Sequence, residues 1–261
     1  MFRFAAVKNN MQRYFIHLSY KGTDYCGWQK QPNGITVQEE IEKALTLVLG
    51  NQTDIMGCGR TDSGVHAHEF FAHFETETTI EPKELTFRLN SILNSAIAIE
   101  KVFQVNQNAH TRFDATSRCY RYYINYLKDP FHTDTSWYLY NTSLDIGKMN
   151  EAAHLLLKVE DFSSFEKIGS DNKTSICNVT FAEWFLTKNG LYFEIRADRF
   201  LRNMVRAIVG TLIEVGKGNI SIEDFKNIIK SKNRGNAGSS VPAKGLFLWE
   251  ITYPLSIRID E

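Results

Sequence analysis

The chain has 261 residues, 43% of them hydrophobic, which is enough for one large domain or two of ordinary size that fold without disulfides. Its four cysteines are widely spaced and form no C-x-x-C pair, which argues against a disulfide framework and a cysteine zinc site. The first fifteen residues lack a signal-peptide core, and no apolar run reaches membrane-spanning length. We therefore expect a cytoplasmic protein that does not enter membranes.

The charges are unevenly distributed along the chain. The formal net charge is zero, which by itself argues against a nucleic-acid partner, because affinity for phosphate comes from Lys and Arg. However, residues 110–128 and 196–206 each contain four basic residues and one acidic residue, whereas acidic residues gather at 39–54 and 75–84. A neutral protein with this distribution can present a basic face.

In the first half of the chain, the clearest helix signal begins at Thr36. Thr36 and Glu39 have the spacing of a capping box, and Gly50 is typical of a helix C-terminus. The expected elements of this half are a strand at 13–20, a helix at 36–49, strands at 53–58 and 69–74, and a helix that begins at Pro82.

In the second half, Asn189-Gly190 predicts a type I′ turn between two strands. A helix is expected over 200–215, with an apolar face and with Arg199, Arg202 and Arg206 together on another face. The other expected elements are strands at 119–126, 180–186, 191–197 and 246–253 and a helix at 222–230.

This succession of elements predicts an α+β fold. Strands and helices are interspersed and hairpins are present, which favours a largely antiparallel sheet with helices on one side. The pattern after Val102 partly repeats the pattern before it, which indicates two related halves. We place an N-terminal half at 1–110 and a C-terminal half at 111–261.

The segment 57–64 has three glycines in eight residues and contains the core Arg60-Thr61-Asp62. Glycine permits positive φ and close approach of a ligand, so this loop can present the carboxylate of Asp62 at the edge of a sheet. Spacing alone also allows Asp62 to cap a turn and pair with Arg60 structurally. The residues by themselves leave both interpretations open.

Five blocks of this sequence resemble the TruA family of tRNA pseudouridine synthases. The loop 59–67, Gly-Arg-Thr-Asp-Ser-Gly-Val-His-Ala, looks like that family's catalytic loop, with Ser63 where the family usually has Ala. The remaining blocks appear in the family's order over nearly the whole chain, at 20–29, 118–122, 200–210 and 245–248.

The resemblance implies the pseudouridine synthase fold and a reaction that needs neither a cofactor nor a metal. The enzyme would break the N-glycosidic bond of a uridine, turn the uracil and rejoin it through C5. Asp62 would be the catalytic carboxylate, and Arg206 would pair with it. Tyr120 would form the wall that receives the extruded base and would assist proton transfer. Without the resemblance, Tyr120 is equally well a cross-strand packing residue.

The resemblance also implies a partner and further contacts. The substrate would be tRNA, modified at positions 38 to 40 of the anticodon stem-loop, and two subunits would form a homodimer that shapes the tRNA-binding cleft. Arg60 would serve RNA phosphate or base extrusion, while Arg199 and Arg202 would lie towards the RNA backbone.

Two other functions remain open at this point. His66 and His68, two apart on a strand, share a face and would form a metal pair with His73 or Asp62, as in a metal-dependent hydrolase. Alternatively, the same arginines and aromatic residues would make an RNA-binding module without turnover, in which the Arg-x-Asp core has no purpose.

Overall fold

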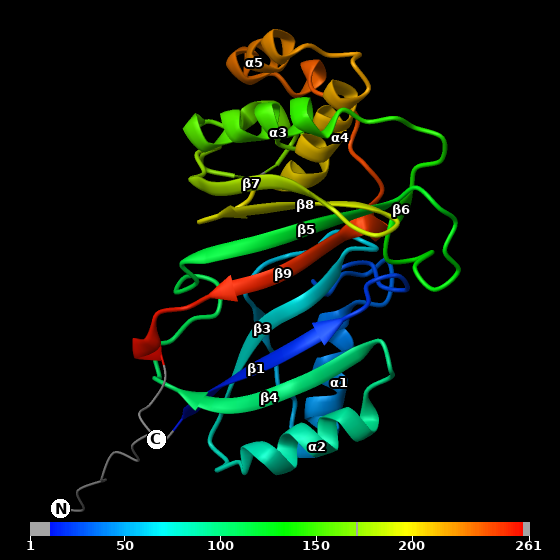
Figure 1. The fold of residues 1–261 in the computed structure, drawn as a ribbon. Helices are drawn as coiled ribbons and strands as arrows, with labels where there is room; N and C mark the ends of the chain where they lie inside the picture. Colours follow the sequence, from blue (N-terminus) through cyan, green and yellow to red (C-terminus); the bar gives the residue numbers. More distant parts are fainter. Residues whose placement is uncertain (1–10, 171, 258–261) are drawn as a thin grey trace, which may run out of the picture.

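The computed structural model describes residues 11–170 and 172–257, which form one mixed sheet flanked by helices (Figure 1). The strand order is β4-β1-β3-β9-β5-β8-β7, with β2 paired to β3 and β6 paired to β5. All pairs are antiparallel except β3–β9 and β5–β6, which confirms the predicted α+β class. The strands are β1 (Gln12–Tyr20), β2 (Met56–Gly57), β3 (His66–Thr76), β4 (Ile97–Val105), β5 (Ser117–Asn125), β6 (Trp137–Tyr138), β7 (Val179–Leu186), β8 (Gly190–Ala197) and β9 (Leu246–Thr252).

The helices lie in two groups at opposite ends of the sheet (Figure 1). The first group packs near β1 and β4 and the second near β7 and β8, so that the protein has two hydrophobic clusters. Tyr120 contacts both clusters, and β9, from the end of the chain, lies between β3 and β5. The helices are α1 (Val37–Leu49) and α2 (Pro82–Ile92) in the first group, and α3 (Ile146–Leu155), α4 (Met204–Gly216) and α5 (Ile222–Ser231) in the second.

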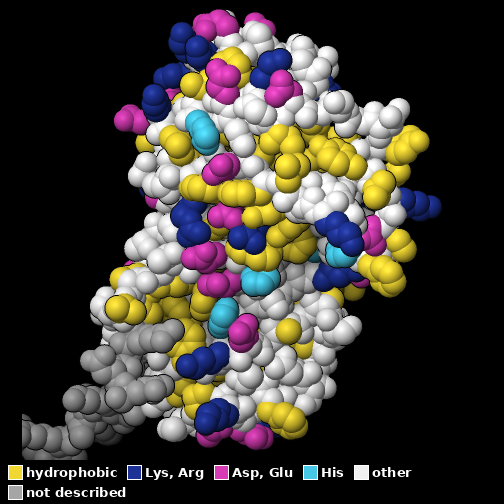
Figure 2. All heavy atoms as spheres, in the orientation of Figure 1, with side chains coloured by type: hydrophobic (Ala, Val, Ile, Leu, Met, Phe, Trp, Pro, Cys, Tyr) yellow, Lys and Arg dark blue, Asp and Glu magenta, His cyan; other side chains and the backbone are white. Residues whose placement is uncertain are grey.

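The two faces of the sheet differ in what covers them. In β5, Tyr122 and Ile124 are buried in the cluster that contains α3 and α4. Arg121, the residue before Tyr122, points to the other face, where its guanidinium lies over the rings of Trp249 and Tyr192, 4.0 and 5.1 Å from their centroids. Figure 2 shows hydrophobic and charged side chains intermixed across the middle of the molecule, where Figure 1 draws the strands in front. No helix of residues 11–170 and 172–257 is drawn in front of these strands, and we call this side the helix-free face of the sheet.

The helix predicted at 200–215 begins four residues later than expected, at Met204. Asn203, its N-cap, lies in the left-handed region with φ 65°, which interrupts helical geometry before that point. The prediction that Arg199, Arg202 and Arg206 share a helix face was therefore wrong. Arg206 is in the first turn of α4, whereas the other two precede the helix.

The predicted type I′ turn at Asn189-Gly190 was also wrong, because neither residue has a positive φ. Residues 187–189 form the loop, and Gly190 is already the first residue of β8. A Cβ on Gly190 would lie 2.0 Å from the carbonyl oxygen of Ile124. Glycine is needed here for the close approach of β5, a requirement that the dipeptide signal does not reveal.

Several boundaries and elements were not predicted. The expected strand at 53–58 is reduced to the two residues of β2, while β3 is longer than predicted at both ends. The elements absent from the prediction are α3, β4 and β6. Thr36 caps α1 as expected by accepting from the Glu39 backbone N–H, but the Glu39 carboxylate pairs with Lys43 at 2.9 Å rather than closing a capping box.

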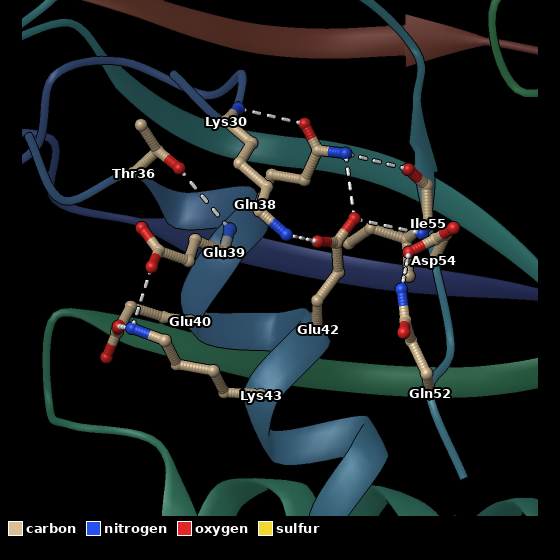
Figure 3. Close-up of polar contacts among 10 residues, drawn as sticks. All are labelled: Lys30, Thr36, Gln38, Glu39, Glu40, Glu42, Lys43, Gln52, Asp54 and Ile55. Carbon is tan, nitrogen blue, oxygen red and sulfur yellow. Dashed lines mark hydrogen bonds and ion pairs between the residues drawn. The ribbon is translucent and has the colours of Figure 1, made fainter. Parts of the chain in front are cut away.

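A buried carboxylate joins α1 to the segment before the glycine loop (Figure 3). Glu42 is 7% exposed and accepts from the Ile55 backbone N–H at 3.2 Å, from Gln38 Nε2 at 2.9 Å and from Lys30 Nζ at 3.2 Å. Gln38 also donates to the Ile55 carbonyl oxygen at 3.0 Å. Both backbone groups of Ile55 are thus bonded, which fixes the chain just before β2.

Glu69, on β3, has an unusually basic carboxylate. Burial raises its pKa from 4.5 to about 7, and the negative charges of Glu250 and Glu100 act in the same direction, while the Ile251 backbone N–H opposes them. Between pH 4.5 and 7 the folded protein binds more protons than the unfolded chain, so this group makes stability fall as pH rises through that window.

We therefore expect Glu69→Gln, which keeps an acceptor for Ile251 and removes the charge, to raise Tm by about 2–4 °C at pH 8. The difference from the parent protein should shrink as the pH approaches 5. Thermal unfolding across this range tests the prediction, with the exposed Glu77→Gln as a control that should show no such trend. An equal Tm at pH 8 would contradict it.

Candidate active site

The glycine loop that carries Asp62 is held by the segment 20–28. The Tyr20 hydroxyl lies 2.9 Å from Thr61 Oγ1, and the Trp28 backbone N–H donates to the Thr61 carbonyl oxygen at 3.4 Å. Gly27 lies against the same carbonyl, where a Cβ would stand only 2.2 Å from the oxygen. Its φ of 87° is also one that glycine adopts without strain.

The residues after Asp62 close a turn against Tyr25. The Val65 backbone N–H donates to the Asp62 carbonyl oxygen at 3.1 Å, and Gly64, with φ 76°, donates to the Tyr25 carbonyl oxygen at 3.3 Å. Ser63 adds its hydroxyl to that carbonyl at 3.2 Å. The segments 20–29 and 59–67 thus pack together as one unit, and their contacts fix the backbone at Asp62.

The Asp62 carboxylate lies between two arginines. Arg206 Nη1 is 3.5 Å from Oδ2, and Arg202 Nε is 3.9 Å from Oδ1. The Arg206 side chain is 21% exposed and its Nε donates to the Val241 carbonyl oxygen at 2.8 Å, whereas the Arg202 side chain is 58% exposed. Arg206 is therefore the closer and less exposed partner of Asp62, and this is the pair that the family resemblance implied.

A cavity of about 790 Å³ opens beside this carboxylate. That volume is within the range of small-molecule sites and is ample for one nucleotide. Its lining carries one acidic side chain and four basic ones, so the cavity attracts anions. The lining residues are Asp62, Ser63, Lys167, Ile168, Arg202, Asn203, Arg206, Arg234, Gly235, Ala237, Ser239 and Ser240.

Tyr120 lies on β5 between the two hydrophobic clusters and near the carboxylate. Its ring meets Phe200 edge to face, with centroids 5.0 Å apart. Burial raises the pKa of its phenol, and the neighbouring Cys58 and Asp62 act in the same direction, while Arg118 opposes them. The phenol is consequently protonated at neutral pH. Tyr120 is outside the residues that line the 790 Å³ cavity.

The sequence also matches known proteins. Residues 17–114 and 152–254 match the family model described as tRNA pseudouridine synthase. The chain belongs to this family. It is 50% identical over 244 residues to tRNA pseudouridine synthase A of Azobacteroides pseudotrichonymphae, covering 94% of this chain and 98% of that protein. Proteins of the same name from Bacteroides fragilis (49% identity, 95% and 99% coverage) and Clostridium acetobutylicum (41%, 93% and 100%) are also similar.

Of the other predicted RNA contacts, Arg202 lines the cavity, whereas Arg60 and Arg199 do not. Arg60 is exposed, and no carboxylate of the described residues forms an ion pair with it. Arg199 donates from Nη1 to the Thr174 carbonyl oxygen at 3.5 Å and does not line the cavity. Arg202, expected to face only the RNA backbone, also approaches Asp62. The candidate site thus brings together Asp62, Arg202 and Arg206, while Arg60 and Arg199 are outside the residues that line its cavity.

The three histidines of the metal-site hypothesis have other partners. His66 is fully buried and its Nδ1 accepts from the Gly22 backbone N–H at 3.0 Å, while Nε2 lies 3.0 Å from the Asp134 carbonyl oxygen. His68 stacks on Trp249, and His73 Nδ1 lies 2.8 Å from Thr111 Oγ1. Within residues 11–170 and 172–257, no three His, Cys, Asp or Glu side chains are placed to hold a metal ion.

Both basic segments, 110–128 and 196–206, have fewer unpaired arginines than their composition indicates. Arg118 donates to the carbonyl oxygens of Asp198 and Arg112, both at 2.7 Å, and so serves the backbone. Arg121 and Arg196 are paired with Glu194 and Glu250. Conversely, the sequence did not identify Lys167, Arg234 and Ser240 as cavity residues, because nothing in their local pattern separates them from an ordinary surface loop.

No helix within residues 11–170 and 172–257 is long and apolar enough to cross a bilayer.

Proposed function

We propose that this protein isomerises uridine to pseudouridine in tRNA. The observation that carries the proposal is the placement of Asp62 on a braced glycine loop, between two arginines and at a cavity of nucleotide size. Its membership of the tRNA pseudouridine synthase family supports the same reaction. In this isomerisation the N1–C1′ bond breaks and a C5–C1′ bond forms, while C5 loses a proton and N1 gains one.

Each side chain has a role that follows from its position. Asp62 attacks the nucleotide covalently or removes a sugar proton, and either role requires the ionised carboxylate. Arg206, paired with Asp62 and anchored on Val241, keeps that charge oriented. The target base must leave its stack to reach Asp62, and Tyr120 then serves as the wall beside it and as a proton donor or relay.

The finer features of the proposal come from the family resemblance. The target uridines are positions 38 to 40 of the anticodon stem-loop, the enzyme works in the cytoplasm, and Arg60, Arg199 and Arg202 contact the RNA backbone. It acts as a homodimer. The helix-free face of the sheet is consistent with a second copy, because Trp249 and Tyr192 there are only partly buried and no described helix covers them.

Tritium release tests the proposed reaction directly. Unmodified tRNA labelled with tritium at uridine C5 is incubated with the protein, with and without a chelator. Release to solvent that the chelator does not affect is the expected result. Binding of the tRNA without any release would instead indicate an RNA-binding module, and release that the chelator abolishes would indicate a metal-dependent enzyme.

We expect Tyr120→Phe to slow turnover about 10²-fold or more, with tRNA affinity changed by less than about threefold. The ring that packs on Phe200 remains and only the phenol is lost. Single-turnover tritium release, together with filter binding of tRNA, separates the two quantities. An unchanged rate would leave Tyr120 a packing residue, and Tyr138→Phe, at an exposed tyrosine, is the matched control.

A further inference from the structure

The cavity beside Asp62 adjoins a second one of about 530 Å³. Lys167, Ile168 and Arg234 line both cavities, whereas Asp62 and Arg206 line only the first. The three shared residues therefore lie where the cavities meet. This junction is a candidate place for the part of a nucleic-acid chain next to a base held at Asp62.

Arg234 presents a partly buried positive charge at the junction. It begins a short 3₁₀ helix, and its guanidinium donates to the Ala237 carbonyl oxygen at 3.4 Å and to Ser240 Oγ at 3.0 Å. Both acceptors are neutral, and no carboxylate within the described part of the chain pairs with Arg234 or Lys167. Burial lowers the pKa of Arg234, as expected for a cation that has lost water without gaining an anion.

Ser240, which lies beside Arg234 in the lining of the first cavity, has a hydroxyl proton available for donation. Its Oγ accepts from Arg234 and also from Asn203 Nδ2 at 2.6 Å. A serine oxygen has two acceptor positions and one proton, so both acceptor positions are engaged and the proton is left to donate. Asn203 makes its bond from a left-handed backbone conformation, which is costly for a residue other than glycine.

We infer that Arg234, Ser240 and Lys167 form a binding site for one backbone phosphate adjacent to the target uridine. The three side chains offer only donors, two of them charged, and the complementary ligand has only acceptors and a negative charge. A phosphodiester meets both conditions, whereas a uracil carbonyl meets only the first. The inference rests on the proposed function, since the RNA chain must enter with its target base at Asp62.

The site is tested by combining a neutral linkage in the RNA with the Arg234→Met substitution in the protein. Anticodon stem-loop RNAs are prepared with a methylphosphonate in place of one of the two phosphates that flank the target uridine. For one of these positions we expect the neutral linkage to weaken binding to the parent protein about 10-fold, but to weaken binding to Arg234→Met less than about twofold. The salt slope for the all-phosphate RNA should fall by about one unit in the variant.

Several controls separate a phosphate contact from a structural role. Arg88→Met, at an exposed arginine on α2, should keep the full sensitivity to the neutral linkage. Lys167→Met alters an exposed side chain and should reproduce part of the Arg234 effect even if Arg234→Met folds poorly. In Arg234→Met and Lys167→Met the loss should fall mainly on KM rather than on kcat, since a phosphate contact contributes equally to ground state and transition state.

Tritium release tests the proposed reaction, whereas sensitivity to the neutral linkages tests the phosphate site. If the parent protein releases tritium but the neutral linkages have the same effect on the parent protein, Arg234→Met and Lys167→Met, the phosphate site is wrong and the proposed reaction stands. A loss of binding in Arg234→Met that is independent of the linkage would also overturn the site, because it would point to a uracil contact or to misfolding. Absence of tritium release from the parent protein would overturn the proposed reaction itself.

Discussion

Asp62→Asn is expected to reduce tritium release from tRNA by at least about 10⁴-fold while tRNA binding changes less than about threefold. The amide has nearly the shape of the carboxylate, and the loop that holds it is fixed through Thr61, Ser63 and Gly64 rather than through the side chain. The substitution therefore removes the charge and nucleophile without displacing the backbone. Single-turnover kinetics at saturating enzyme measure the loss.

The control for this prediction is Ser63→Ala, at the neighbouring residue of the same loop. It removes a 3.2 Å bond to the Tyr25 carbonyl oxygen and leaves the carboxylate in place. We expect this variant, which restores the residue usual in the family, to retain most of its activity. Substantial turnover by Asp62→Asn would exclude Asp62 as the catalytic carboxylate.

Arg206→Met is expected to lower the saturated rate about 10²-fold, equivalent to ~2.7 kcal/mol of transition-state stabilisation. The lost guanidinium is 3.5 Å from Asp62 and bonded to the Val241 carbonyl oxygen, so both the charge partner and the orientation of Asp62 are affected. The figure is below that for a fully enclosed ion pair, because water reaches the Asp62 side chain, which is 32% exposed.

Arg202→Met provides the comparison within the same pair of arginines. Arg202 is 3.9 Å from the carboxylate but 58% exposed, so screening weakens its interaction with Asp62. We expect its loss to weaken tRNA binding and lower the salt slope by about one unit, with less than about fivefold change in saturated rate. If the two variants gave the same rate loss and the same salt slope, the special role of Arg206 would be wrong.

Strong local patterns predicted much of the fold. The periodicity of β1, the cap and stop of α1, the proline at the start of α2 and the β7–β8 hairpin are all local signals, and the structure contains these elements. Local signals did not predict the length of a strand where contacts with distant parts of the chain determine it. Residues 53–58 form only a two-residue strand because Glu42 in α1, rather than a neighbouring strand, bonds the backbone of Ile55.

The residues of the candidate site also differ in how far the sequence could predict them. The family resemblance pointed to Asp62, Tyr120, Arg206 and Arg60, whereas Arg202 was expected only towards the RNA backbone. The structure places both Arg202 and Arg206 within 4 Å of the Asp62 carboxylate. Which arginine is the inner partner was not accessible from spacing, since a continuous helix was expected through Asn203. Its left-handed backbone separates Arg202 from the first turn of α4.

The sequence alone determined the α+β class, because capping residues and alternating strands act through neighbours in the chain. The five blocks that resemble the family indicated the family and pointed to Asp62 as the candidate carboxylate. Only the tertiary structure decided which charges are free. Arg118, Arg121 and Arg196 looked available for RNA and are bonded to carbonyl and carboxylate groups, while the acceptors of Arg234 among the described residues are neutral. A charge is neutralised by whatever lies within a few ångströms of it, and those neighbours come from distant parts of the chain.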